Sequence, residues 1–141
     1  MNLAESWKKG ALLMLDKAEW AEQASKTPLD PRLKDFENPT WKCNLFVADM
    51  IYLSKFVPPA NEPGWFSKKQ WPLAASQWKE EVPGWTKESK ICRGDVVSTG
   101  KHMGIAISET RVMAAGTWTV HSGANHKLTT GVVIQRINCP V

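Results

Sequence analysis

Apolar residues recur at two different spacings along the chain, three or four apart in its first part and two apart in its last part. Over residues 3–25 they fall on one stripe of a helix: Leu3, Trp7, Ala11, Met14, Leu15, Ala18 and Ala21. This spacing predicts an amphipathic N-terminal helix. Pro28 and Pro31 follow it, and each proline removes a backbone donor and disfavours helix in the preceding residue, so the helix should end before them.

A second helix is predicted to begin around residues 39–43 and to run to about Lys55. Asn38 or Thr40 can cap its first turn. Apolar residues cover almost its whole circumference, which is typical of a buried central helix; they are Leu45, Phe46, Val47, Met50, Ile51, Tyr52 and Leu53. Cys43 lies at the amino end of this helix.

Residues 58–90 are rich in Pro, Gly and Trp and are interpreted as a connection, with a short helix expected around 73–80. From Cys92 onward the spacing becomes two, in short β-branched runs at 95–97, 103–107, 111–114, 118–121 and 132–137. Turn residues separate these runs, so we expect an antiparallel meander. Helices followed by strands indicate an α+β fold with a helix packed on one face of the sheet, and the length fits one domain spanning residues 1–141.

Composition narrows the class of protein. With 43% hydrophobic and 23% charged residues, the chain is typical of a globular protein rather than a disordered one. No apolar run approaches the roughly 18–20 residues that cross a bilayer, and the run at 10–15 has no cleavage site after it. We therefore expect neither a transmembrane segment nor a signal peptide. The net charge of +4 favours anionic partners, but the basic residues are scattered and form no nucleic-acid motif, so we expect no nucleic-acid partner.

Cys43 and His102 are the residues that can do chemistry together. The free amides and the positive dipole end of a helix stabilise a thiolate, so the pKa of Cys43 should fall and its sulfur should become nucleophilic. The same amides can hold an oxyanion. A cysteine nucleophile needs a base, and His102 stands at the start of the apolar strand 103–107. From residue type alone, the alternative stays open that Cys43 is a core residue and His102 a structural one.

Four segments add to this picture, because they occur together in a familiar order. They are Cys43-Asn44-Leu45-Phe46-Val47, Trp71-Pro72-Leu73, Val82-Pro83-Gly84-Trp85, and Gly94-Asp95-Val96-Val97 followed by His102-Met103-Gly104-Ile105. With them, over roughly residues 40–123, the chain resembles the NlpC-type and CHAP-type cysteine amidases of bacterial cell walls, and in particular the small amidase effectors of the type VI secretion system. The resemblance implies a papain-like core in which Cys43 opens the central helix as nucleophile and His102 opens a strand as base.

The third catalytic position departs from the family pattern. In NlpC-type members a polar residue follows the histidine by about a dozen residues, where this chain has Met113-Ala114-Ala115. In CHAP-type members the third group comes several residues later, near Thr119 or His121 here. We take His121 as the best candidate, with Thr119, or an ordered water beside a bare Cys–His dyad, as the alternatives.

The resemblance also implies a function. It implies a peptidoglycan amidase that hydrolyses a peptide bond of meso-diaminopimelate, either the cross-link to D-Ala, which we favour, or the γ-D-Glu linkage. No metal and no organic cofactor would be needed. An effector of this kind is made in the cytoplasm without a signal peptide, is exported by a secretion machine and acts in the periplasm of the target bacterium. Its partners would be the peptidoglycan stem and a cognate immunity protein that blocks the active-site groove.

The three cysteines, Cys43, Cys92 and Cys139, lie far apart and show no zinc spacing. At most two of them can pair with each other. The oxidising destination that the resemblance implies would allow a disulfide between Cys92 and Cys139 and leave Cys43 as the free thiol. The alternative is that Cys92 and Cys139 are both unpaired.

The eight tryptophans allow two interpretations. Trp65, Trp71 and Trp78 lie in the connection, where flat rings can line a groove and stack on substrate, together with Asn44 beside the nucleophile. The alternative is that the rings pack the connection against the core. Two other functions stay open: a phage or housekeeping wall hydrolase with the same site, and a non-catalytic Trp-rich module that binds glycan.

Overall fold

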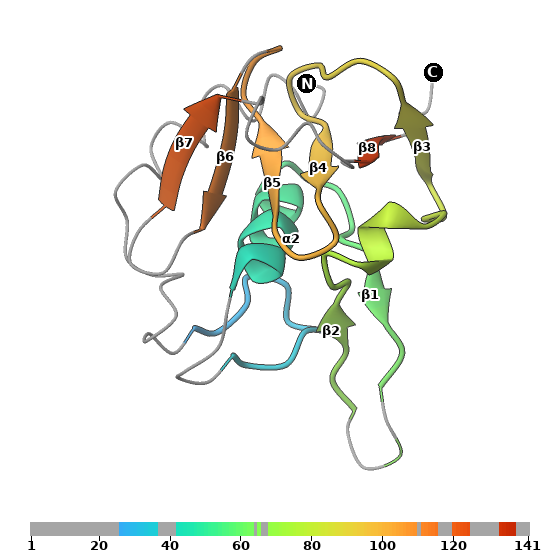
Figure 1. Cartoon of the computed structure of the whole chain (residues 1–141). Coiled ribbons are helices and arrows are strands. Elements are labelled where there is room, and N and C mark those ends of the chain that lie inside the picture. The colour runs from blue at the N-terminus through green and yellow to red at the C-terminus, as the bar shows by residue number, and fades with distance from the viewer. Residues whose placement is uncertain are drawn as a thin grey trace.

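The computed structural model describes residues 26–36, 42–63, 65, 68–109, 111–115, 120–124 and 133–137. Within these ranges it holds one α-helix, α2 (Cys43–Leu53), a short 3-10 helix, η2 (Gln77–Lys79), and eight strands in two sheets. The helix lies against one face of the larger sheet (Figure 1). The predicted α+β fold is confirmed, and the predicted helix over 3–25 lies outside the described residues.

α2 is the central helix of the main core, and a defined backbone motif ends it. All residues from 45 to 51 are buried, as the apolar circumference predicts. After the helix, Lys55 takes a left-handed conformation with φ +72°. The N–H of Lys55 donates to the carbonyl of Tyr52, and the N–H of Phe56 donates to the carbonyl of Ile51. This pair of hydrogen bonds is a Schellman motif, which satisfies the last helical carbonyls.

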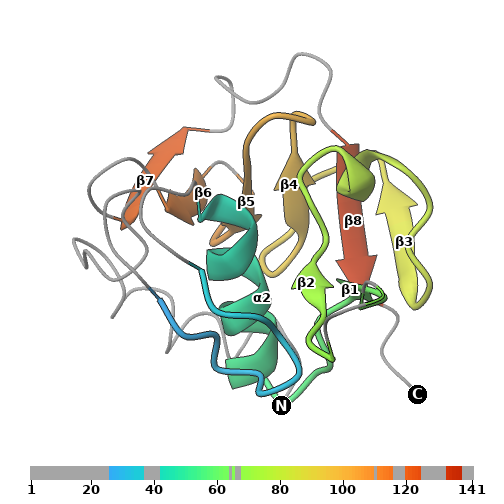
Figure 2. The same ribbon diagram turned by 90° about the horizontal axis from the view of Figure 1, so that it is seen from below.

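The larger sheet is antiparallel, with strand order β3-β8-β4-β5-β6-β7 (Figure 2). Its strands are β3 (Trp85–Glu88), β4 (Val96–Ser98), β5 (Met103–Ala106), β6 (Arg111–Ala115), β7 (Val120–Ala124) and β8 (Val133–Ile137). Strands β4 to β7 form the predicted meander. The last strand corrects the prediction, because β8 inserts between β3 and β4 instead of following β7. In this place β8 pairs on both of its edges and gives β3 a partner.

The connection over 58–90 holds more regular structure than the sequence predicts. Strand β3 forms inside it because Trp85 is anchored on both sides: its backbone pairs with Ile137, and its ring meets the ring of Trp78 edge-on at 4.8 Å between centroids. The short helix expected around 73–80 is the 3-10 helix η2.

The two faces of the larger sheet pack against different side chains, as strand alternation requires. On the α2 side, Val96, Met103, Ile105 and Met113 are buried against the helix and against the two paired tryptophans. On the opposite side, a smaller buried cluster is formed by Val97, Ala106 and Val112. Strands β5 and β6 therefore hold the helix in place.

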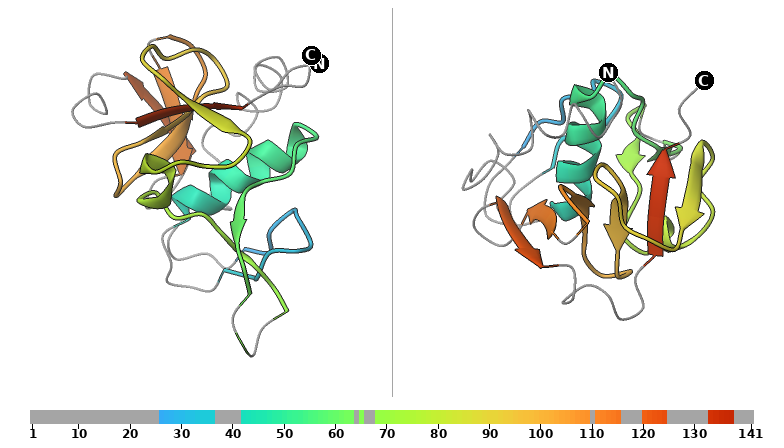
Figure 3. Two further views of the ribbon diagram at one scale, coloured as in Figure 1. Left: turned by 90° about the vertical axis from the view of Figure 1, so that its right-hand side faces the viewer. Right: turned by 90° about the horizontal axis from the view of Figure 1, so that it is seen from above.

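The smaller sheet is a two-stranded ribbon of β1 (Ala60–Asn61) and β2 (Trp71–Pro72). It lies on the helix side and points away from the larger sheet (Figure 3). The segment 26–36 runs beside it, because the N–H of Lys34 donates to the carbonyl of Gln70 at 2.8 Å and the N–H of Gln70 donates to the carbonyl of Arg32 at 2.8 Å. The end of α2, the ribbon and this segment thus form one continuous flank.

Candidate active site

Cys43 is the first residue of α2, as the sequence predicts, but its chemical state differs from the prediction. The residue is only 8% exposed. Burial raises the pKa of the Cys43 thiol, and this effect outweighs hydrogen bonds from the backbone of Met103, Asn44 and Cys43 itself, which lower it. The expected fall of the pKa is therefore wrong for the structure as it stands. Burial therefore disfavours the thiolate more than the hydrogen bonds at the helix start favour it.

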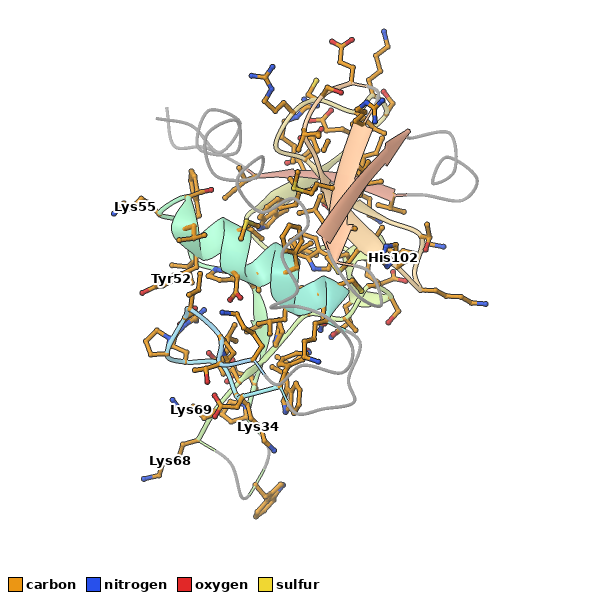
Figure 4. The ribbon with its side chains drawn as sticks, turned by 90° about the vertical axis from the view of Figure 1, so that its left-hand side faces the viewer. Lys34, Tyr52, Lys55, Lys68, Lys69 and His102 are labelled. Carbon is orange, nitrogen blue, oxygen red and sulfur yellow. The ribbon has the colours of Figure 1, made fainter. Side chains whose placement is uncertain are left out.

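The sulfur of Cys43 lies against the start of β5. The backbone of Met103 lies close enough to the sulfur to lower its pKa, and Met103 directly follows His102. His102 is half-buried and lies toward the end of α2 that is opposite Tyr52 and Lys55 (Figure 4). The structure therefore brings the cysteine at the helix start beside the strand that His102 precedes.

A short turn between β4 and β5 holds the backbone of His102. The hydroxyl of Thr99 accepts the N–H of His102 at 3.0 Å and that of Lys101 at 3.3 Å. The N–H of Thr99 in turn donates to the carbonyl of His102 at 2.9 Å. Ser98 fixes the turn to the segment before η2, because its hydroxyl donates to the carbonyl of Ala75 at 2.6 Å. His102 is thus held by a hydrogen-bonded loop rather than by regular strand pairing.

The glycine in the segment His102-Met103-Gly104-Ile105 has a packing reason. A Cβ atom added at Gly104 would come within 2.5 Å of the carbonyl oxygen of Met113 on β6. Only glycine lets the two strands approach this closely. The residue therefore sets the distance between β5 and β6, two positions from His102.

The first turn of α2 places backbone amides beside the sulfur of Cys43. The first intrahelical bond in the described chain runs from the N–H of Phe46 to the carbonyl of Lys42 at 2.9 Å, and the side chain of Lys42 does not cap the helix. The amides of Cys43 and Asn44 lie close enough to the sulfur to affect its pKa. Donors of this kind beside a nucleophile can stabilise an oxyanion.

His121 and Asn44, the other polar site candidates, lie in different surroundings. His121 lies on β7, where its backbone is registered directly opposite Ala114 of β6. Asn44 is half-buried and lines a small hollow with Pro72 and Trp78 that has no room for a water molecule. Thr119, the alternative third residue, lies outside the described residues.

The three candidate tryptophans are separated by the fold. Trp78 is 2% exposed and packs edge-on against Trp85, so its ring belongs to the core and no ligand reaches it. Trp71 is 39% exposed on β2, where its ring meets Phe36 and the ammonium of Lys34 lies 5.3 Å from its centroid. Trp65 is fully exposed between β1 and β2. The small hollow that Trp78 lines does not include Cys43 among its lining residues.

Other polar residues of the motifs have structural roles. Asp95 is 1% exposed and forms an ion pair with Arg136 at 3.0 Å, while its second carboxylate oxygen accepts the N–H of Cys92 at 2.8 Å. It therefore holds the turn before β4, as expected of a strand-start residue. Cys92 is an exposed free thiol, and its possible disulfide partner Cys139 lies outside the described residues.

Sequence reasoning missed three groups beside Cys43 or His102. The contact from the backbone of Met103 has no signal in the sequence, because any residue carries an amide. Lys42 is 1% exposed although it is a lysine, and its position directly before Cys43 is its only signal. Thr99 carries a usable signal, since a threonine three residues before a histidine can close a hydrogen-bonded turn.

The described residues hold no group of three or more His, Cys, Asp and Glu side chains placed to bind a metal ion. None of the described helices has the length and apolar character needed to cross a membrane. The sequence matches no protein-family model, and no curated protein is similar to it.

Proposed function

We propose that the chain is a cysteine amidase of peptidoglycan with a papain-like core, in which Cys43 is the nucleophile and His102 the base. The observation that carries the proposal is the position of the Met103 backbone, which lies close enough to the sulfur of Cys43 to lower its pKa. Because Met103 follows His102, this contact brings the two reactive residues to the same end of α2 from distant parts of the sequence. The antiparallel sheet packed on a helix that begins with cysteine is compatible with the implied core.

Because burial raises the pKa of the Cys43 thiol, we propose that the reaction starts from the protonated thiol. His102 takes the thiol proton as the sulfur of Cys43 attacks the amide carbon, so a free thiolate is never exposed in the buried site. The amides of Cys43 and Asn44 donate hydrogen bonds to the oxyanion of the tetrahedral intermediate, a contribution of about 3–4 kcal/mol per donor in comparable sites. The imidazolium then returns its proton to the leaving amine, and the carbon–nitrogen bond breaks to give a thioester.

A water molecule completes the cycle. His102 accepts a proton from this water as its oxygen attacks the thioester carbonyl. The carbon–sulfur bond breaks, the carboxylic acid leaves, and the proton returns to the sulfur of Cys43. Atoms and charges balance without a metal or an organic cofactor.

His121 is the third residue that we propose. Where NlpC-type members carry a polar residue, this chain has Met113-Ala114-Ala115, and β7 pairs with this part of β6. The register of β6 and β7 puts His121 directly opposite Ala114, which supports a replacement from the neighbouring strand. A polar group there would hold the imidazole of His102 in one tautomer.

The substrate and setting rest on the resemblance. We propose cleavage at meso-diaminopimelate, at the cross-link to D-Ala in preference to the γ-D-Glu linkage. The same resemblance supports delivery by a type VI secretion system into the periplasm of a target bacterium, and inhibition by a cognate immunity protein over the active-site groove. The segments around Cys43 and His102 carry this part of the proposal.

Isolated sacculi provide the test. Wild-type protein should release new amines and change the muropeptide profile, with loss of cross-linked dimers if the D-Ala bond is cut. Cys43→Ala should abolish this change, while Cys92→Ala should keep it, because Cys92 is exposed and lies on another turn. An unchanged profile with folded wild-type protein contradicts the proposal, and co-sedimentation without cleavage would favour a glycan-binding module.

A further inference from the structure

The exposed large apolar side chains gather on one flank of the described molecule. They are Leu29 (37% exposed), Tyr52 (41%), Leu53 (47%), Val57 (71%), Trp65 (100%) and Trp71 (39%). All of them come from residues 29–71, and the described strands of the larger sheet contribute none. Apolar exposure that is confined to one side of a molecule marks an interaction surface.

Hydrogen bonds join the segments of this flank into one body. The N–H of Leu29 donates to the carboxylate of Asp49 in α2 at 3.0 Å. The guanidinium of Arg32 donates to the carbonyl of Pro58 at 3.0 Å, and the ammonium of Lys69 donates to the carbonyl of Pro31. The segment 26–36 thus ties the end of α2 to the ribbon.

The same segments carry four exposed lysines. They are Lys34, Lys55, Lys68 and Lys69. In Figure 4, Lys55 lies with Tyr52 at the end of α2 away from His102, and Lys34, Lys68 and Lys69 lie below the helix, beside the ribbon. Only two exposed carboxylates, those of Asp35 and Glu62, belong to the same described segments. The flank therefore combines positive charge with exposed aromatic and aliphatic groups.

We propose that this basic-aromatic face, formed by Lys34, Lys55, Val57, Trp65, Lys68 and Lys69, binds the surface of an anionic lipid bilayer. Tryptophan favours the interface between water and acyl chains, and lysines near a membrane are attracted to anionic headgroups. Trp65, on the ribbon that points away from the sheet, inserts its ring at headgroup depth, and Val57 adds an aliphatic contact. The chain then lies on the membrane and does not span it.

The aliphatic members distinguish a bilayer from a glycan. A sugar stacks on a flat aromatic ring but gains little from the aliphatic side chain of Val57, which is 71% exposed. A bilayer surface buries aromatic and aliphatic groups alike and supplies the negative charge. The face is also separate from the start of α2, so a bound bilayer leaves the region of Cys43 and His102 uncovered.

Vesicle sedimentation tests the proposal on the full chain. The protein should sediment with vesicles of equimolar phosphatidylglycerol and phosphatidylcholine and remain in solution with pure phosphatidylcholine. The double variant K55E/K68E should lower the partition coefficient by at least about tenfold. The matched control K87E/K90E changes two exposed lysines of the sheet side by the same charge and should bind like the wild type. Trp65→Ala should weaken binding and abolish the blue shift of tryptophan emission.

Three results would overturn the proposal. They are equal binding to both vesicle types, equal loss in the two double variants, and binding to isolated sacculi but not to anionic vesicles, which would indicate a wall polymer instead. Failure here is distinguishable from failure of the proposed function, because Cys43→Ala should bind vesicles like the wild type. Thermal melts of each variant check that binding is compared between folded proteins.

Discussion

At the scale of single residues, the burial of Cys43 decides its reactivity. Since desolvation raises its pKa, the thiolate fraction of Cys43 near neutral pH is smaller than that of an ordinary exposed thiol. We predict that iodoacetamide modifies Cys43 more slowly than Cys92 at pH 7, and that the rate for Cys43 keeps rising beyond pH 9. Peptide mapping by mass spectrometry measures both sites in one molecule, with the exposed Cys92 as internal control. Faster modification of Cys43 at pH 7 would mean a preformed thiolate.

Thr99 is predicted to position His102 through its hydroxyl. Thr99→Val removes an acceptor for the N–H of His102 and should lower kcat by about tenfold to a hundredfold, with KM nearly unchanged, because only the base is misplaced. Thr99→Ser keeps the hydroxyl and should restore most of the rate. Steady-state kinetics on a soluble muropeptide separate the two constants. Equal loss in both variants would show that the hydroxyl has no positioning role.

The sequence predicts where Cys43 lies in the helix, but it does not predict how deeply single side chains are buried. The helix pattern correctly places Cys43 at the start of α2, because the spacing of apolar side chains fixes that start. The direction of its pKa shift depends on burial against β5, which comes from a distant part of the chain. Likewise Trp78 and Trp65 look alike in the sequence, yet one is in the core and the other fully exposed.

At the scale of elements, the end of α2 contains a correctable strain. Lys55 has a φ of +72°, a conformation that a residue with a Cβ adopts at a cost. Lys55→Gly should therefore stabilise the protein by roughly 0.5–1 kcal/mol, since the gain in the folded state exceeds the entropy added to the unfolded chain. The control Ser54→Gly should destabilise, because Ser54 has a φ of −83° and its hydroxyl bonds the carbonyl of Met50. Urea denaturation measures both, and a destabilised Lys55→Gly would contradict the argument.

The elements differ in how far the sequence predicts them. Strands β4 to β7 follow from alternation of apolar residues with turn residues between them. β3 does not, because Thr86, Lys87 and Glu88 are polar and partly or fully exposed, and only Trp85 is buried. Its formation depends on pairing with Ile137, about fifty residues away. Local patterns carry no information on such a pair.

At the scale of the whole molecule, an ion pair links stability to acid pH. Burial acts to raise the pKa of Asp30, but hydrogen bonds and charge from Arg32 outweigh it, so the pKa lies below its usual value. The unfolded chain therefore binds the proton more readily, and the free energy of unfolding should fall as the pH drops from about 5 through the folded pKa. Asp30→Asn should give a flatter acid limb in urea titrations between pH 5 and about 2. An identical slope in both proteins would contradict this assignment.

The sequence predicts the α+β fold class, but it does not predict the order of the strands in the sheet. Helical spacing followed by strand spacing indicates α+β, because each period fixes which face can be buried. Two features depend on long-range hydrogen bonds. They are the insertion of β8 between β3 and β4 and the packing of segment 26–36 beside the ribbon. The contact between the start of α2 and β5 also joins distant parts of the chain. The site residues could therefore be proposed from their types, but their geometry could not be predicted.

The most direct test of the central claim is a double-mutant cycle between Cys43 and His102. The measurement is kcat/KM on a defined cross-linked muropeptide for the wild type, Cys43→Ala, His102→Ala and the double variant. If the two residues act as one unit, each single variant should lose at least about a thousandfold, and the double variant should be no worse than Cys43→Ala alone. Near-wild-type activity in either single variant, or losses that multiply in the double variant, would contradict the account.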